Sequence, residues 1–172
     1  MKRYLTIILA VFFSINLAHA QEAAGQKSKL ALYWQKVKDS VVQCGLCPRR
    51  CVLEPGQRGF CTVRINKGGS LYTLGYANPV AVHIDPIEKK PFFHVAPGEP
   101  ILSLAVAGCN MRCAFCQNWQ ISQSRPDEVE SYYLPPQEVV NKTIESGCKF
   151  IAYTYTEPTV FYEYMLDISK IA

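Results

Sequence analysis

The sequence predicts an α/β protein: an incomplete parallel (β/α) barrel of about two strand–helix units, preceded by a cysteine-rich, loop-rich module. The first observation is that apolar runs and helical patterns alternate after residue 100, an order typical of parallel α/β folds. The second is that residues 44–98 contain most of the glycines and prolines and the first cysteine group. The third is the composition, 49% hydrophobic and 19% charged, which indicates a globular chain.

The first twenty residues have the three parts of a secretory signal peptide. Lys2 and Arg3 form a basic start, residues 5–17 are mostly apolar, and residues 18–20 offer a cleavage site between small residues. The apolar run is short for a bilayer span, which favours a cleaved signal over an uncleaved anchor. A soluble helix or a wrongly assigned start is the third alternative. We therefore expect a signal-peptide-like segment at residues 1–20, and membrane contact only through it.

Residues 21–98 form the predicted N-terminal cysteine-rich module. Apolar side chains at helical spacing predict a helix over residues 21–43, and these side chains are Leu30, Tyr33, Trp34, Val37 and Val41. Loops and short strands are expected after it, with a hairpin around the turn at residues 67–70. The sequence Pro-Gly-Glu-Pro at residues 97–100 marks the predicted boundary with the next module.

Residues 99–172 are predicted to begin the barrel. The expected elements are a buried strand at 101–107, a loop at 108–134, a helix at 136–145 ended by Gly147, a strand at 150–155 and a helix after Glu157. A full barrel needs about 250 residues. We therefore expect this chain either to be a fragment or to be completed by another polypeptide.

The charge balance excludes one class of partner. The net charge is +4, and without the first twenty residues 16 basic residues face 14 acidic ones, which leaves +2. A charge this small does not indicate electrostatic binding to a polyanion, so no nucleic-acid partner is expected.

A C-x3-C-x2-C run directly follows the first predicted strand of the barrel. Its thiols belong to Cys109, Cys113 and Cys116. Three thiolates on one tight loop suit three irons of a cubane [4Fe–4S] cluster and leave the fourth iron open, whereas clusters that only transfer electrons normally have four cysteine ligands. A zinc or disulfide site is the alternative, but structural zinc normally takes four ligands and no fourth lies adjacent.

The first cysteine group along the chain precedes the boundary and consists of Cys44, Cys47, Cys51 and Cys61, so the three-cysteine loop is the second group. Four thiols at this spacing suit an auxiliary iron–sulfur cluster or a structural zinc, and two disulfides are the alternative in an exported chain. The short C-x2-C spacing favours metal, without choosing between zinc and iron. Cys148 stands apart and is expected to be a buried small apolar residue.

The segment Tyr155-Thr156-Glu157-Pro158 directly follows the second predicted strand. Because active sites of parallel barrels lie at the carboxyl ends of the strands, this segment and the three-cysteine loop are expected side by side. Glu157 is therefore a candidate to bind the amino group of a ligand held on the open iron. The alternative is a solvated carboxylate at the start of a helix, where acidic residues are common.

These residues resemble the radical S-adenosylmethionine (SAM) superfamily, through the three-cysteine loop with an aromatic residue, Phe115, before its last cysteine. The string over residues 108–119 is similar to the pyruvate formate-lyase activating enzyme-like branch. Within that branch, residues 44–51, 85–91 and 155–158 resemble the AmmeMemoRadiSam-system radical SAM proteins. The resemblance covers roughly residues 40–165.

The resemblance implies a role for each candidate residue. Cys109, Cys113 and Cys116 would ligate the [4Fe–4S] cluster, and SAM would chelate its fourth iron. Phe115 would lie near the adenine. Glu157 would contact the SAM amino group, although Tyr155 and Thr156 replace the glycines that precede this glutamate in the superfamily. At residues 85–91 the resemblance hints at substrate or partner contact by Glu88, Lys89 or Lys90, against the alternative of a solvated turn.

The function implied is that of an oxidoreductase similar to glycyl-radical activases. It would generate a 5′-deoxyadenosyl radical for hydrogen abstraction, supplied by an external one-electron reductant and acting on a possible protein substrate. The alternatives are a truncated iron–sulfur or zinc module that binds or transfers electrons without SAM turnover, and an exported disulfide-bonded domain. The compartment stays open, because the N-terminal segment indicates export or membrane association and cluster chemistry favours the cytoplasm.

Overall fold

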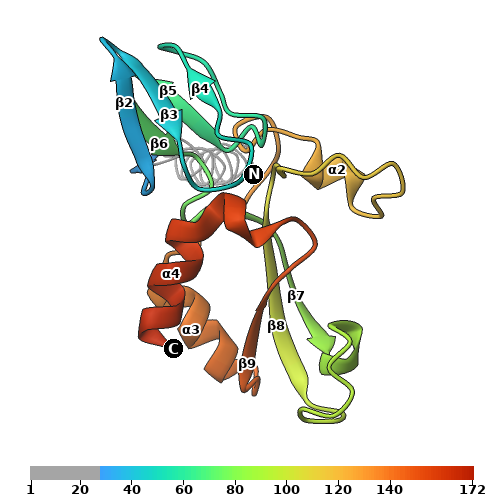
Figure 1. Ribbon diagram of the computed structural model, residues 1–172. Helices are drawn as coiled ribbons and strands as arrows, with labels where there is room; N and C mark the ends of the chain where they lie inside the picture. The colour runs from blue at the N-terminus through green and yellow to red at the C-terminus, as the bar shows by residue number, and fades with distance from the viewer. Residues whose placement is uncertain (1–27) are drawn as a thin grey trace, which may run out of the picture.

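The computed structural model describes residues 28–172, so the signal-peptide-like segment lies outside the described residues. Figure 1 shows small sheets packed above the helices α3 and α4, with a longer sheet beside them. The mixture of strands and helices confirms the α/β class. Within residues 28–172, no helix has the length and apolarity that crossing a membrane requires.

Two three-stranded antiparallel sheets build the N-terminal part, in the orders β1-β6-β5 and β2-β3-β4. Their strands are β1 (Lys29–Leu30), β2 (Trp34–Lys38), β3 (Val41–Cys44), β4 (Val52–Leu53), β5 (Arg64–Lys67) and β6 (Ser70–Thr73). The hairpin of β5 and β6 confirms the predicted turn at residues 67–70.

The helix predicted over residues 21–43 is wrong for its described part, which forms strands. β2 and β3 pair as a hairpin whose turn contains Asp39 at a φ of +46°, a conformation that Asp tolerates. Val42 is completely buried while Val37, on the predicted apolar helix face, is 54% exposed. Burial therefore follows the alternation of a strand, and the apparent helical spacing was coincidental.

A third sheet has the order β7-β8-β9. Its strands are β7 (Pro79–Pro86), β8 (Pro100–Val106) and β9 (Phe150–Tyr153). β8 and β9 pair in parallel, as the strand–helix–strand order predicted, and β8 is buried over nearly its whole length. β7 pairs with β8 antiparallel, so the sheet is mixed and continues across the boundary predicted at residue 98.

Two helices follow the predicted positions closely, whereas a third, short helix lies within the stretch at residues 108–134 that was predicted as a loop. They are α2 (Trp119–Ser122), α3 (Pro136–Glu145) and α4 (Tyr162–Ile171), with 3-10 turns η1 (Ile87–Lys89) and η2 (Pro158–Phe161). Pro136 begins α3, where a missing N–H costs nothing. Gly147 lies just past its end at a φ of +70°, and its N–H donates to the carbonyl of Ile144.

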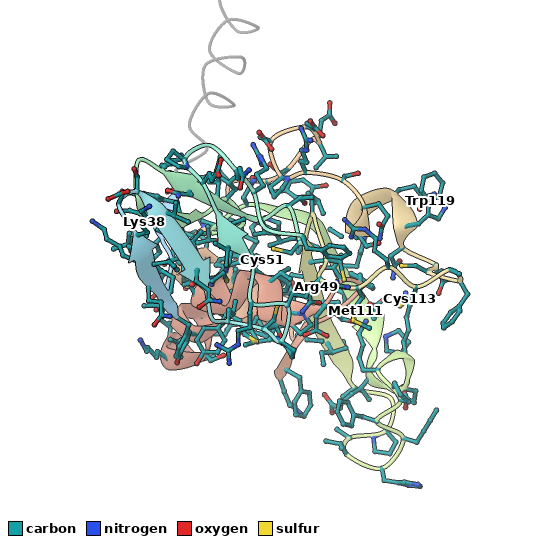
Figure 2. All side chains as sticks on the ribbon, turned by 45° about the horizontal axis from the view of Figure 1, so that its top comes forward. Lys38, Arg49, Cys51, Met111, Cys113 and Trp119 are labelled. Atoms are coloured by element: carbon teal, nitrogen blue, oxygen red, sulfur yellow. The ribbon has the colours of Figure 1, made fainter. Side chains whose placement is uncertain are left out.

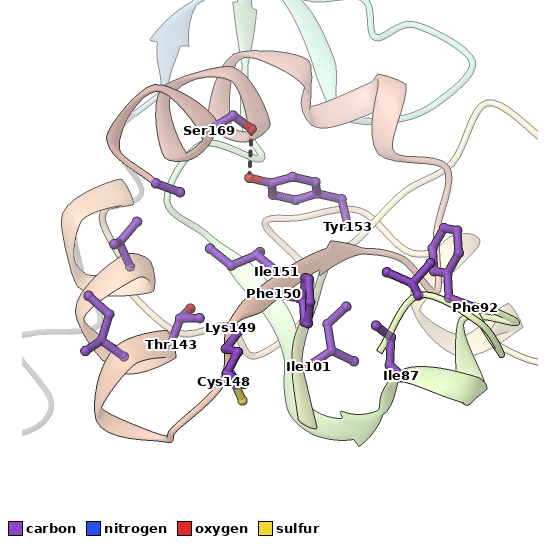
Figure 3. Close-up of a pocket in the computed structure, with 14 residues that line it drawn as sticks. Ile87, Phe92, Ile101, Thr143, Cys148, Lys149, Phe150, Ile151, Tyr153 and Ser169 are labelled. Carbon is purple, nitrogen blue, oxygen red and sulfur yellow. Dashed lines mark hydrogen bonds between the residues drawn. The ribbon is translucent and has the colours of Figure 1, made fainter. Parts of the chain in front are cut away.

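The two faces of the third sheet differ in character. Leu102, Leu104 and Val106 alternate along β8 and pack into the main core with α3 and α4. The opposite face carries polar groups, among them Asp85 and Ser103. Along the outer side of β9, apolar side chains and the helices enclose a large cavity, shown in Figure 3, which contains none of the residues predicted to bind the cluster or SAM.

Helix α4 joins the N-terminal sheets to the rest of the chain through charged groups. Arg64 of β5 and Glu163 of α4 form an ion pair in which each side chain is 2% exposed. The Glu163 carboxylate also accepts a hydrogen bond of 2.7 Å from the backbone N–H of Leu32. One turn further on, Asp167 pairs with Lys29 and accepts a hydrogen bond from Tyr76. The cysteine-rich part is therefore docked on α4 by buried polar contacts.

Candidate functional site

The three-cysteine loop begins at Gly108, immediately after β8, and only glycine fits there. Its φ is +93°, a region that L side chains rarely adopt. A Cβ on Gly108 would lie 2.6 Å from Cγ2 of Val63 and 2.8 Å from Oγ1 of Thr62, and against the carbonyl oxygen of Cys61. The loop of the second cysteine group thus starts in backbone contact with the last cysteine of the first.

Cys109, Cys113 and Cys116 all line one cavity of about 590 Å³, at the carboxyl ends of β8 and β9. This volume is within the range of small-molecule sites, about 300–1,000 Å³. Cys109 is buried, Cys116 is half-buried and Cys113 is exposed, so the thiols run from the floor of the cavity to its mouth. In Figure 2, Met111 and Cys113 lie together on this open side of the molecule.

The surroundings of these thiols suit negatively charged sulfur. The backbone N–H of Met111 donates to Sγ of Cys109 at 3.4 Å, and Oγ of Ser122 lies 3.4 Å from Sγ of Cys116. Hydrogen bonds to sulfur are one of the ways a protein tunes an iron–sulfur cluster. The donor set therefore fits a cluster with three thiolate ligands. Among residues 28–172, no three His, Cys, Asp or Glu side chains are already arranged around a common metal position.

The segment after β9 forms the opposite wall of the same cavity, as its position predicted. Thr154, Tyr155, Thr156 and Glu157 all line it. Oγ1 of Thr156 donates to the carbonyl of Val106 at 3.0 Å, which ties this wall to the end of β8. The Glu157 carboxylate accepts hydrogen bonds from the N–H and hydroxyl of Thr159, at 3.1 and 2.5 Å, and so caps η2. Glu157 thus combines the helix-start role with a place on the cavity wall.

Phe115 is not brought to the cavity. Its side chain is 90% exposed and does not line the space shared by the three thiols. This exposure also excludes a role in the apolar core. Its predicted contact with an adenine ring stays a prediction.

The alternative of a solvated turn at residues 85–91 holds only in part, because Lys89 is exposed whereas Asp85 and Ile87 are buried. Asp85 is buried and accepts hydrogen bonds from Lys89 at 2.7 Å, from Lys90 at 2.6 Å and from the hydroxyl of Tyr155. Burial acts to raise the pKa of Asp85, but these hydrogen bonds outweigh it and hold that pKa well below its usual range. Lys89 and Lys90 also line the thiol cavity, a role that sequence patterns did not reveal beyond the family resemblance.

The first cysteine group is enclosed rather than open. Cys44, Cys47, Cys51 and Cys61 line one cavity of about 20 Å³, whose walls are almost entirely apolar. Arg64 also lines it, with Nη1 3.9 Å from Sγ of Cys44. Burial raises the pKa of the Cys61 thiol, against the effect of hydrogen bonds from the neighbouring backbone. The structure therefore brings all four predicted thiols to one small interior space.

Contacts between the two cysteine groups are numerous and specific. Nε of Arg49 donates to the carbonyl of Asn110 at 2.6 Å, and Figure 2 shows Arg49 between Cys51 and Met111. The ring of Phe60 lies between two guanidinium groups, with the carbon of Arg49 3.4 Å and that of Arg112 4.4 Å from its centroid. Sequence spacing gave no sign that the groups are neighbours.

Residues 104–172 match the family model of the radical SAM superfamily. The match contains the three-cysteine loop and Glu157, and leaves the first cysteine group outside it. Proteins of this superfamily in general use a [4Fe–4S] cluster and SAM, and residues 104–172 of this chain are similar to them.

The chain is also similar to two proteins of Methanocaldococcus jannaschii. One, "Uncharacterized protein MJ0808", is 50% identical over 142 residues, which is 83% of this chain and 43% of that protein. The other, "Uncharacterized protein MJ0674", is 29% identical over 106 residues, 59% of this chain and 26% of that protein. The chain thus spans less than half the length of the curated relatives it matches. No solved structure gives a significant match.

Proposed function

We propose that this chain contributes the cluster-binding part of a radical SAM enzyme. Cys109, Cys113 and Cys116 hold a [4Fe–4S] cluster, and the fourth iron binds SAM. When bound, the cluster would pass one electron from an external reductant to SAM, which would break the S–C5′ bond into methionine and a 5′-deoxyadenosyl radical able to abstract hydrogen from a substrate. The observation that carries the proposal is the single cavity that all three thiols share with the segment ending at Glu157.

In this proposal, each residue of the cavity has a different role in binding. The buried Cys109 anchors the cluster against the end of β8, while the exposed Cys113 closes it at the mouth. Glu157 is the acceptor for the ammonium of SAM, since its capping bonds occupy Oε1 only. The apolar core below β8 and β9 keeps water from the floor, which strengthens electrostatic interactions there.

The finer parts of the proposal rest on the resemblance of residues 108–119 and of the segments around it. They are a reaction like that of glycyl-radical activases, an external one-electron reductant and a protein substrate. In the same proposal, β8 and β9 with α3 and α4 are the first two units of a radical SAM barrel.

A second metal is proposed at the first cysteine group. Its support is the convergence of Cys44, Cys47, Cys51 and Cys61 on one enclosed cavity. Four thiolates complete the coordination of zinc or of one iron–sulfur cluster, so this site holds no open position for a ligand.

Anaerobic reconstitution with iron and sulfide tests both sites. The wild-type chain should gain about four irons at the loop, and SAM should change the electron paramagnetic resonance spectrum of the reduced cluster. Cys113→Ala should abolish that cluster and leave the metal of the first group. Cys148→Ala, which removes a buried thiol outside both groups, is the matched control and should change neither.

Each contrary result has a distinct meaning. An iron–sulfur cluster whose spectrum does not change when SAM is added would support the electron-transfer alternative. Zinc alone in both groups would support a binding module. Loss of both metals in Cys113→Ala, or of neither, would show that the division into two sites is wrong.

A further inference from the structure

Tyr155 has a strained backbone at the edge of the proposed SAM site. Its φ is +63°, an outlier for a bulky aromatic residue. The N–H of Thr156 donates to the carbonyl of Thr154 at 2.8 Å, so Tyr155 is the centre of a three-residue γ-turn. The γ-turn with a positive central φ is rare and strained, and strain of this kind persists only where the surrounding structure imposes it.

The side chain of Tyr155 is held by groups from another strand. Its hydroxyl donates to Asp85 of β7, across the polar face of the sheet. Nζ of Lys90 lies 4.6 Å from the ring centroid, and the ring of His83 meets it edge-on at 5.9 Å. Lys90 is itself 7% exposed and paired with Asp85. Three residues at the end of the sheet therefore fix one aromatic ring.

The backbone of the turn is held from the opposite side. Nδ2 of Asn118 donates to the carbonyl of Tyr155 at 3.0 Å. Asn118 lies two residues after Cys116, so the turn is clamped between the three-cysteine loop and β7. The hydroxyl of Thr156 completes the hold by donating to Val106.

We infer that Tyr155 is a positioning residue, whose tether to Asp85 holds the strained turn that sets Thr156 and Glu157 on the wall facing the three thiols. The inference rests on the proposed function for what the wall binds. The superfamily pattern noted above has glycines where this chain has Tyr155 and Thr156. Glycine adopts a positive φ without strain, whereas tyrosine needs an external hold, and Asp85 with Lys90 supplies it.

The protonation states of the tether agree with this role. Burial and the hydrogen bond to Asp85 raise the pKa of Tyr155 to about 12, so the hydroxyl keeps its proton at neutral pH. Asp85 stays a carboxylate because two lysines donate to it. The tether is thus a neutral donor on a charged acceptor, the stronger kind of hydrogen bond.

Tyr155→Phe tests the inference, with Tyr76→Phe as the matched control. Both changes remove a tyrosine hydroxyl that donates to an aspartate, but Tyr76 bonds Asp167, away from the cavity. Amide hydrogen exchange of peptides covering residues 154–159, measured on the chain without cluster, should be faster in Tyr155→Phe only. In reconstituted protein the dissociation constant for SAM should rise by about tenfold in Tyr155→Phe, with the iron content unchanged.

A double variant sharpens the assignment. Asp85→Ala, which removes the acceptor, should speed exchange in the same peptides, and adding Tyr155→Phe to Asp85→Ala should do little more than Asp85→Ala alone, because the tether is already lost. Unchanged exchange in Tyr155→Phe overturns the inference, as does an equal effect in Tyr76→Phe. If wild-type protein fails to bind SAM, the proposed function falls, while the exchange comparison still decides whether Tyr155 holds the turn.

Discussion

The two cysteine groups of this chain lie in backbone contact yet have opposite surroundings. The first surrounds an apolar space of about 20 Å³ under Arg64, whereas the second opens on a cavity of about 590 Å³ with both polar and apolar walls. The first has four thiols for one site, and the second has three. Thiol number and enclosure therefore change together, which agrees with the proposal of a saturated metal site in the first group and an open cluster in the second.

The enclosure of each cysteine group is therefore set by its long-range contacts rather than by the spacing of its cysteines. The first group is covered by residues from β5 and η2, which are far apart in sequence. The second follows one strand, and the segment after β9 faces it across an accessible gap. The predictions below test this contrast, in order of expected effect.

Arg64→Met should have the largest effect on stability. It leaves the buried carboxylate of Glu163 without a cation, and breaking a buried ion pair in this way costs about 3–5 kcal/mol. Arg112→Met, beside the open group, should cost about 1 kcal/mol or less because that side chain binds at the surface. Chemical denaturation of both variants measures the difference.

The matched double variant shows whether charge is the cause. Arg64→Met with Glu163→Leu removes both partners and should recover a large part of the loss. No recovery would mean that Arg64 acts through packing around the thiols instead.

Gly108→Ala should have the next largest effect on stability, because the added Cβ pushes the two cysteine groups apart. A Cβ there meets the backbone carbonyl of Cys61 and the side chain of Val63 at a positive φ, and strain plus overpacking cost about 2–4 kcal/mol. Gly98→Ala has a similar φ of +80° with open space around it, and should cost only about 1–2 kcal/mol. Thermal unfolding of the pair checks this, and equal losses would contradict a tight contact at Gly108.

Asp85→Asn tests, through the pH dependence of stability, how much the charge of Asp85 stabilises the fold beside the second cysteine group. The folded pKa of Asp85 is lowered, so its carboxylate stabilises the fold above the unfolded pKa of about 4 and loses that effect as the pH falls through the folded pKa. The difference in unfolding free energy between wild type and Asp85→Asn should therefore shrink on acidification below about pH 4. A difference that stays constant with pH would show that the charge of Asp85 is immaterial.

Phe60→Ala should have the smallest effect. It removes a ring that lies between Arg49 and Arg112, and cation–π contacts at exposed sites contribute about 0.5–1 kcal/mol each. Phe93→Ala, which removes a more exposed aromatic ring, should cost less than Phe60→Ala. If denaturation curves show a larger loss of stability in Phe93→Ala than in Phe60→Ala, Phe60 does not help to hold the two cysteine groups together.

Much of the C-terminal half could be predicted from sequence. The strand expected at residues 101–107 is observed as Pro100–Val106, and the helix expected at 136–145 has those bounds. These elements are either continuously apolar and buried or have clear end signals, such as Pro136 and Gly147. Their positions are therefore determined by local sequence. The cavity shared by Glu157 and the thiols follows from parallel-strand geometry alone.

The rest of the fold and of the candidate site depends on long-range contacts, which local sequence patterns do not encode. Residues 34–44 have helical apolar spacing, but pairing of β2 with β3 and burial of Val42 override it. β7 was missed because its residues include polar ones such as His83 and Asp85, which face a functional side of the sheet. The tether from Asp85 to Tyr155 joins residues 70 positions apart, so only the fold reveals it.

The ion pair of Arg64 with Glu163 has a consequence for biogenesis. Chains generally fold by domains from the N-terminus during synthesis, yet this arginine meets its carboxylate only after 99 further positions have been translated. Until then the guanidinium lacks its carboxylate, although the carbonyl of Leu32, its other acceptor, is already present in the chain. The buried ion pair, and with it the docking of the first cysteine group on α4, can therefore be completed only after α4 has been synthesised.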